Sequence, residues 1–171
     1  MIPSRAVFSL FLAFAGVLPA WGPAQEAVRP PEGFELAATI SVPGNVAWTD
    51  SGLEVAAGEE LYFEATGTVS LQRENPIAEC GPEGLKFGTM QQPLTDRNLG
   101  CLLGRVVVRV EVFEDRETKE KTTREYGEVF AIGSAVLAAM PADGRLTFGV
   151  NENVVGDNAG AFLVTVFRRK A

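Results

Sequence analysis

Three observations predict an all-β protein built as an antiparallel β-sandwich or jelly roll. Apolar residues occur in about nine short runs with alternating or β-branched character. Gly, Pro, Asn and Asp interrupt these runs about every 8–12 residues, the turn spacing of sandwich folds. Only residues 134–140 are a plausible helix, and that stretch is short. One domain is expected, because 171 residues of which 46% are hydrophobic suffice for a single core.

The expected strands begin after a Pro- and Glu-rich linker at residues 25–33. Within the fourth run, Leu61, Phe63 and Ala65 alternate and so share one face. The clearest strand, residues 102–113, is dense in β-branched residues. Residues 50–52, Asp-Ser-Gly, are expected to form a turn. The predicted strands cover residues 34–42, 45–49, 53–55, 61–67 (continued by 69–71), 102–113, 126–132, 135–140, 145–150 and 162–167.

Two segments between strands stand out. Residues 72–100 contain three prolines and several glycines, and a loop of this length in a compact domain is usually functional or pinned down. Residues 114–125 mix acids and bases. They could form an exposed helix, since Glu117 and Lys121 are four apart, but their place between two β-rich runs favours the tip of a long hairpin.

The first 24 residues have the pattern of a signal peptide. Arg5 precedes an apolar run of about 13 residues, too short to span a bilayer core, and small residues at Gly22-Pro23-Ala24 resemble a cleavage site. We therefore expect residues 1–24 to be removed and the domain, residues 34–171, to be secreted or periplasmic, without membrane insertion. An uncleaved N-terminal anchor is the alternative.

Composition excludes several function classes. The chain has 22 acidic and 15 basic residues, a net charge of −7, which argues against nucleic-acid or anionic-membrane partners. It has no histidine, so Ser-His-Asp and Cys-His catalytic arrangements are impossible. No phosphate-binding or dinucleotide motif is present. We expect a protein that is not an enzyme.

The two cysteines, Cys80 and Cys101, enclose residues 81–100, the larger part of the long loop. In an oxidising compartment such a pair is expected to form a disulfide, which would stabilise the fold by about 3 kcal/mol on the chain-entropy model. Two separate thiols are the alternative, because the sequence shows no geometry.

A cluster of oxygen-bearing side chains follows the last but one strand. The stretch NENVVGDNAG, residues 151–160, carries two carboxylates and no base, and its glycines allow sharp bends. Oxygen ligands of this kind suit a hard cation such as Ca²⁺, and two carboxylates would neutralise a divalent ion. A plain turn remains the alternative, because turns favour the same residues. The candidate ligands are Asn151, Glu152, Asn153, Asp157 and Asn158.

Residues 144–166, GRLTFGVNENVVGDNAGAFLVTV, resemble the closing motif of the bacterial galactophilic lectins of the PA-IL type. In that family a strand ends in Asn-Asp, and a short loop leads to an Asn/Asp-Asn pair, a glycine and a Phe-led strand. The resemblance covers residues 34–171. It implies a galactose-binding-domain-like jelly roll that binds Ca²⁺ at one end, where sugar hydroxyls complete the coordination of the ion.

Carried over by position, the resemblance assigns roles to individual residues. It implies a calcium site with ligands from Asn151, Glu152, the Val154 carbonyl, Asp157 and Asn158, and contacts of Glu152 and Asp157 with the sugar. Gln92-Pro93 occupies the position of a His-Pro pair that holds the sugar in the family. Glu152 replaces the usual aspartate, in a shorter loop.

The implied function is an exported, calcium-dependent carbohydrate-binding module without catalysis. Its partner would be a carbohydrate, galactose-like if the family specificity holds. The replacement of the usual aspartate by Glu152, the shorter loop and the missing histidine favour an alternative, a structural or protein-interaction module that has kept the fold and lost the sugar. Its contact surface would be the charged hairpin, residues 114–125.

Overall fold

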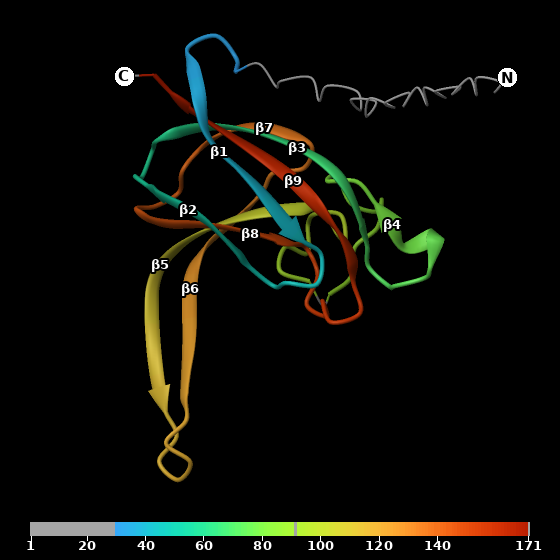
Figure 1. Ribbon diagram of the computed structural model, residues 1–171, viewed down its shortest axis with the longest axis vertical. Coiled ribbons are helices and arrows are strands. Elements are labelled where there is room, and N and C mark those ends of the chain that lie inside the picture. Colours follow the sequence, from blue (N-terminus) through green and yellow to red (C-terminus); the bar gives the residue numbers. More distant parts are fainter. Residues whose placement is uncertain (1–29, 91, 171) are drawn as a thin grey trace, which may run out of the picture.

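The computed structural model describes residues 30–90 and 92–170, which form two antiparallel β-sheets packed face to face (Figure 1). One sheet has the order β1-β9-β3-β4, with β7 also paired to β3, and the other has the order β2-β8-β5-β6. The predicted antiparallel β-sandwich is therefore confirmed. The strands are β1 (Phe34–Pro43), β2 (Thr49–Val55), β3 (Glu60–Ser70), β4 (Glu79–Cys80), β5 (Leu102–Glu114), β6 (Lys121–Ala131), β7 (Ala135–Ala139), β8 (Gly144–Val150) and β9 (Ala159–Arg169).

The core lies between the two sheets and follows from the alternation of side chains along the strands. Leu61, Phe63 and Ala65 of β3 are all buried, as the pattern predicts. The ring of Phe63 lies edge-on to that of Phe148 from the opposite sheet, with 6.1 Å between ring centroids. Phe162 of β9 is fully buried in the same cluster. The two faces are thus joined in the core by aromatic and aliphatic contacts.

Three element predictions need correction. Residues 45–48 are not a strand, and residues 50–52 belong to β2, where the pairing with β8 shifts register between Asp50 and Glu54. Gly52 has φ +74, so this bulge uses the same residues as a turn. The hairpin tip is also shorter than predicted, because β6 begins at Lys121. The strand predicted at 135–140 is confirmed as β7, and the short helix considered for 134–140 does not form.

The long loop is anchored by short-range structure. Its first part contains a 3₁₀ helix, Pro76–Ala78, followed by the two-residue strand β4, and β4 pairs with the end of β3. An isolated bridge joins Leu85 to Leu99. The only helix in the described part of the chain is this single turn, so no helix there is long and apolar enough to cross a membrane. The predicted signal peptide, 1–24, and most of the linker lie outside the described residues.

The cysteines do not form the predicted disulfide in this structure. Cys80 and Cys101 are both buried free thiols. Burial raises the pKa of each thiol to about 11, and the nearby Glu152 carboxylate contributes to the rise at Cys80. The two thiols are therefore protonated and unreactive near neutral pH.

A thiol titration distinguishes the two states. We expect Ellman's reagent at pH 8 to detect no thiol in the folded protein and two per chain after unfolding, since roughly one thiol in a thousand is ionised three units below its pKa. If unfolding without reductant releases no thiol, the cysteines are paired as the sequence predicts.

Candidate functional site

The candidate site is the loop between β8 and β9, residues 151–158, together with the chain segments that it touches. The loop begins where β8 ends at Val150 and returns to the sheet at Ala159. The backbone N–H of Arg73, just after β3, donates to the carbonyl of Asp157 at 2.8 Å. Gly44, after β1, packs against the end of β3, where a Cβ on it would be 2.6 Å from Val69, and its carbonyl accepts from the side chain of Asn158 in the loop at 3.1 Å. Three strand ends therefore meet at this loop.

Asn158 is the central residue of the site. Its side chain is fully buried, and its Nδ2 donates to the carbonyl of Gly44 at 3.1 Å and to Oε2 of Glu152 at 2.7 Å. Its Oδ1 is buried and has no hydrogen-bond partner. A buried amide oxygen without a partner is costly, and native proteins rarely keep one without a water, an ion or a ligand. The structure thus places an unused ligand atom beside a carboxylate.

The two acids of the loop give the site its charge. Burial raises the pKa of Glu152 above its ordinary value, the hydrogen bond from Asn158 opposes this, and the negative charge of Asp157 adds to the rise. Asp157 itself is exposed. A cation between these groups would stabilise the ionised form of Glu152 and remove the repulsion. The electrostatics therefore favour a positively charged ligand.

Asn151 is used differently from the prediction. Its side chain is fully buried and faces the long loop, not Asn158. Oδ1 accepts from the N–H of Leu94 at 2.9 Å, while Nδ2 donates to the carbonyls of Leu94 and Asn98 at 2.9 and 3.0 Å. Since its amide is engaged with the loop backbone, Asn151 holds the loop in place and does not join the cluster around Asn158.

Gln92, predicted to contact a sugar, is also turned inward. Only 5% of its surface is exposed. Its Oε1 accepts from the N–H of Thr89 at 2.8 Å, and its Nε2 donates to the carbonyls of Leu94 and Arg97, both at 2.7 Å. Pro93 is exposed beside it. In this structure Gln92 shapes the loop, and a sugar contact through it would have to replace those bonds.

A groove of about 310 Å³ opens beside Glu152. At its rim Phe87 and Ile77 are 56% and 86% exposed. An exposed aromatic ring next to polar groups is a common platform for a sugar ring or another flat ligand. Sequence reasoning did not single out these residues, because nothing local marks which part of the long loop lies near residue 152. The groove is lined by Leu71, Gln72, Asn75, Ile77, Ala78, Leu85, Phe87, Leu99 and Glu152.

The donor set fits a hard cation better than a transition metal. No group of three or more His, Cys, Asp or Glu side chains that could hold a metal occurs among the described residues. The Nδ2 of Asn158 donates to the Glu152 carboxylate and to the Gly44 carbonyl, Asp157 directly precedes Asn158 in the chain, and Val154 is an exposed residue of the same loop. The possible ligand atoms of this region are therefore oxygens of carboxylates, an amide and the backbone. Such mixed oxygen sets are typical of Ca²⁺ in extracellular modules.

Comparison with protein-family models and with curated proteins found no match. Eight chains of solved structures match the fold. One of them, described as "EclA N-terminal domain; PllA-like lectin", is 26% identical, with a TM-score of 0.53 over 78% of this chain and 98% of that chain. The protein therefore has a lectin-like β-sandwich fold. The likeness does not single out the PA-IL type of galactophilic lectin.

Proposed function

We propose that this protein is an exported, calcium-dependent carbohydrate-binding module without catalytic activity. The observation that carries the proposal is the buried, unpartnered Oδ1 of Asn158 beside the Glu152 carboxylate. The lectin-like fold supports a carbohydrate as the ligand. The matching protein is a lectin domain, and the absence of histidine removes the commonest catalytic base.

In this proposal the residues of the loop and of its surroundings have different roles. Asn158 Oδ1, the carboxylates of Glu152 and Asp157 and a loop carbonyl such as that of Val154 would hold Ca²⁺. When bound, the ion would supply coordination positions for two sugar hydroxyls. Phe87 would pack against the apolar face of the sugar in the adjacent groove. Gly44 and Asn151 would position the loop without touching the ion.

A calorimetric titration tests the calcium part of the proposal. We expect saturable calcium binding with a dissociation constant on the order of 10⁻⁴–10⁻³ M, and its loss in the Asp157→Ala variant, because one of two neutralising carboxylates is removed. Glu35→Ala is the matched control. Its acid is exposed at the start of β1, near Arg168 and Arg169, at the opposite end of β9 from the loop.

The outcomes separate the parts of the proposal. Binding that survives in Asp157→Ala would move the ion away from this loop, and no binding up to about 10 mM would leave the loop a plain turn. If calcium binds, retention on immobilised glycans with and without chelator tests the sugar, and equal retention in both would contradict the calcium requirement.

A structural or protein-interaction module is the second candidate function. It is favoured by the hairpin of β5 and β6, which extends beyond the sandwich and bears exposed apolar residues (Figure 1). Under this alternative chelation would leave partner binding unchanged, and the glycan experiment would show no retention at all.

A further inference from the structure

The outer part of the β5–β6 hairpin, residues 108–128, forms an arm with an open edge. β8 pairs with β5 only from Leu102 to Val107. Beyond that point β5 has β6 on one side and, within the described residues, no strand on the other. Figure 1 shows the arm projecting away from the sandwich. Proteins usually protect such an edge, because its free N–H and C=O groups can pair with another strand.

Three valines form a row on one face of the arm, next to its open edge. Val108, Val110 and Val112 are 51%, 55% and 62% exposed, at alternate positions of β5, and Val108 lies where the pairing of β5 with β6 shifts register. The aromatic residues of the arm are less exposed, 45% at Phe113 and 36% at Tyr126, and an arginine lies over each ring. The guanidinium of Arg109 lies 4.5 Å from the ring centroid of Tyr126, and that of Arg124 lies 5.0 Å from the ring centroid of Phe113. An uncovered apolar row beside an open edge indicates a surface for a partner.

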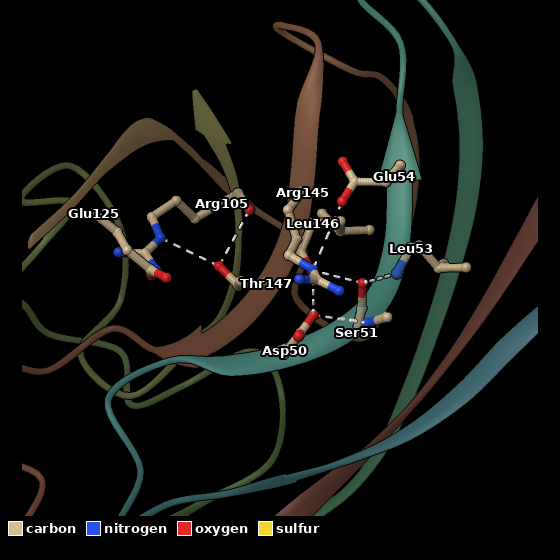
Figure 2. Close-up of polar contacts among 10 residues, drawn as sticks. Asp50, Ser51, Leu53, Glu54, Arg105, Glu125, Arg145, Leu146 and Thr147 are labelled. Carbon is tan, nitrogen blue, oxygen red and sulfur yellow. Dashed lines mark hydrogen bonds and ion pairs between the residues drawn. The ribbon is translucent and has the colours of Figure 1, made fainter. Parts of the chain in front are cut away.

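The root of the arm is fixed to the body. Arg105 of β5 is buried, and its guanidinium lies 4.3 Å from the ring centroid of Trp48. Figure 2 shows the same side chain reaching Glu125 on β6 and Thr147 on β8. Because one buried cation ties three strands together, the arm leaves the sandwich in a set direction and its edge needs little ordering on binding.

We propose that a second copy of this chain occupies this edge, with β5 paired antiparallel to β5 of the copy about a two-fold axis at Val110. In this register Val108 faces Val112 of the copy, and Arg109 faces Glu111 of the copy. Shifting the axis by one residue would place Arg109 opposite Arg109, or Glu111 opposite Glu111, and like charges directly opposite destabilise a sheet. The self-complementary sequence thus selects one isologous dimer.

The dimer leaves the candidate calcium loop free. Leu102 of β5 pairs with Val150, where that loop begins, whereas Val107 pairs with Arg145 at the other end of β8. The arm therefore leaves the sheet at the end away from the loop. Two copies joined through their arms would present two loops to one ligand surface, and linked sites bind a multivalent surface more tightly than single ones. The pairing itself does not depend on calcium or sugar.

Charge complementation tests the register. Arg109→Glu gives an arm with acids at both 109 and 111, and Glu111→Arg gives an arm with bases at both. We expect sedimentation velocity to show each variant associating at least about tenfold more weakly than the wild type, since like charges face each other twice. An equimolar mixture should associate again as a heterodimer. Each arm keeps its own like-charged pair in the mixture, so an effect within one chain cannot explain recovery.

A second pair of variants controls for surface charge. Val110→Lys places two ammonium groups together at the axis and should give a monomer, whereas Leu137→Lys alters an apolar residue of similar exposure, 50% against 55%, on β7 of the other sheet and should leave the dimer intact. A wild-type monomer at about 100 µM, or a mixture that stays monomeric, overturns the proposed pairing. Calcium titration of Val110→Lys should match the wild type, so this failure is separable from failure of the calcium site.

Discussion

Replacing Asn151 by alanine is expected to destabilise the protein by about 3 kcal/mol, the largest effect of any single polar substitution in the loop. The change removes three buried hydrogen bonds and leaves the N–H and C=O of Leu94 and the carbonyl of Asn98 without their partner. Each unsatisfied buried group costs on the order of 1–3 kcal/mol unless the loop opens to water. The melting temperature should fall by roughly 10 °C.

The matched control is Asn153→Ala, two residues further along the same loop. Asn153 is exposed, and its truncation should change the melting temperature by little. Thermal denaturation of the two variants in calcium-free buffer shows whether the stability of the protein depends on the hydrogen bonds of Asn151. Equal stabilities would mean that the long loop does not depend on Asn151, and the residue would again be available as a cation ligand.

The different roles of Asn151 and Asn158 could not be predicted from the sequence. Both are buried asparagines of one short loop, and both were predicted as calcium ligands. What separates them is contact with distant segments: Asn151 meets Leu94, 57 residues away, and Asn158 meets Gly44, 114 residues away. Local composition holds no information about those neighbours, so the pattern predicted an oxygen-rich site without distinguishing the residue that anchors the loop from the one with the free oxygen.

The fold was more predictable because its signals are local. Alternation at Leu61, Phe63 and Ala65 marks a face that must be buried, whatever packs against it. At Gly52 the sequence predicts a turn and the structure has a bulge, because both use a glycine with positive φ. The role of Gln92 could not be predicted from the sequence. Only the folded loop shows that the side-chain amide of Gln92 forms hydrogen bonds with backbone groups no more than five residues away.

The lectin-like fold and the candidate site support different parts of the proposed function. The fold supports a carbohydrate ligand, but one fold can serve many functions. The site adds a physical reason that is independent of the fold: a buried oxygen has no donor, and a half-buried glutamate lies near a second acid, so a cation would relieve both, whereas a water would satisfy only the oxygen. Substitutions at Asn158 therefore test the site directly.

We expect Asn158→Leu and Asn158→Asp to change calcium binding in opposite directions. Leucine removes Oδ1 and should weaken calcium affinity by at least roughly 100-fold, as loss of a direct ligand exceeds the usual cost of losing an outer partner. Aspartate keeps the oxygen and adds a charge. It also replaces the donor that now lies 2.7 Å from Oε2 of Glu152 by a second acceptor, so without calcium two carboxylates face each other.

Thermal denaturation with calcium or with chelator shows the difference. At tenfold excess over its dissociation constant calcium should stabilise the wild type by about 1.4 kcal/mol and Asn158→Leu by nothing measurable. Asn158→Asp should be the least stable of the three in chelator and should gain more from calcium than the wild type, because the ion also relieves its carboxylate repulsion.

Asn153→Asp is the matched control, since it adds the same charge to the same loop at an exposed position. If its gain from calcium equals that of Asn158→Asp, the added charge acts at long range and Oδ1 is not a ligand. If only Asn158→Asp gains, the ion lies within reach of the atom that the structure leaves without a partner. A gain in Asn158→Asp together with unchanged affinity in Asn158→Leu would mean that the wild-type site holds calcium through Glu152 and Asp157 without Asn158.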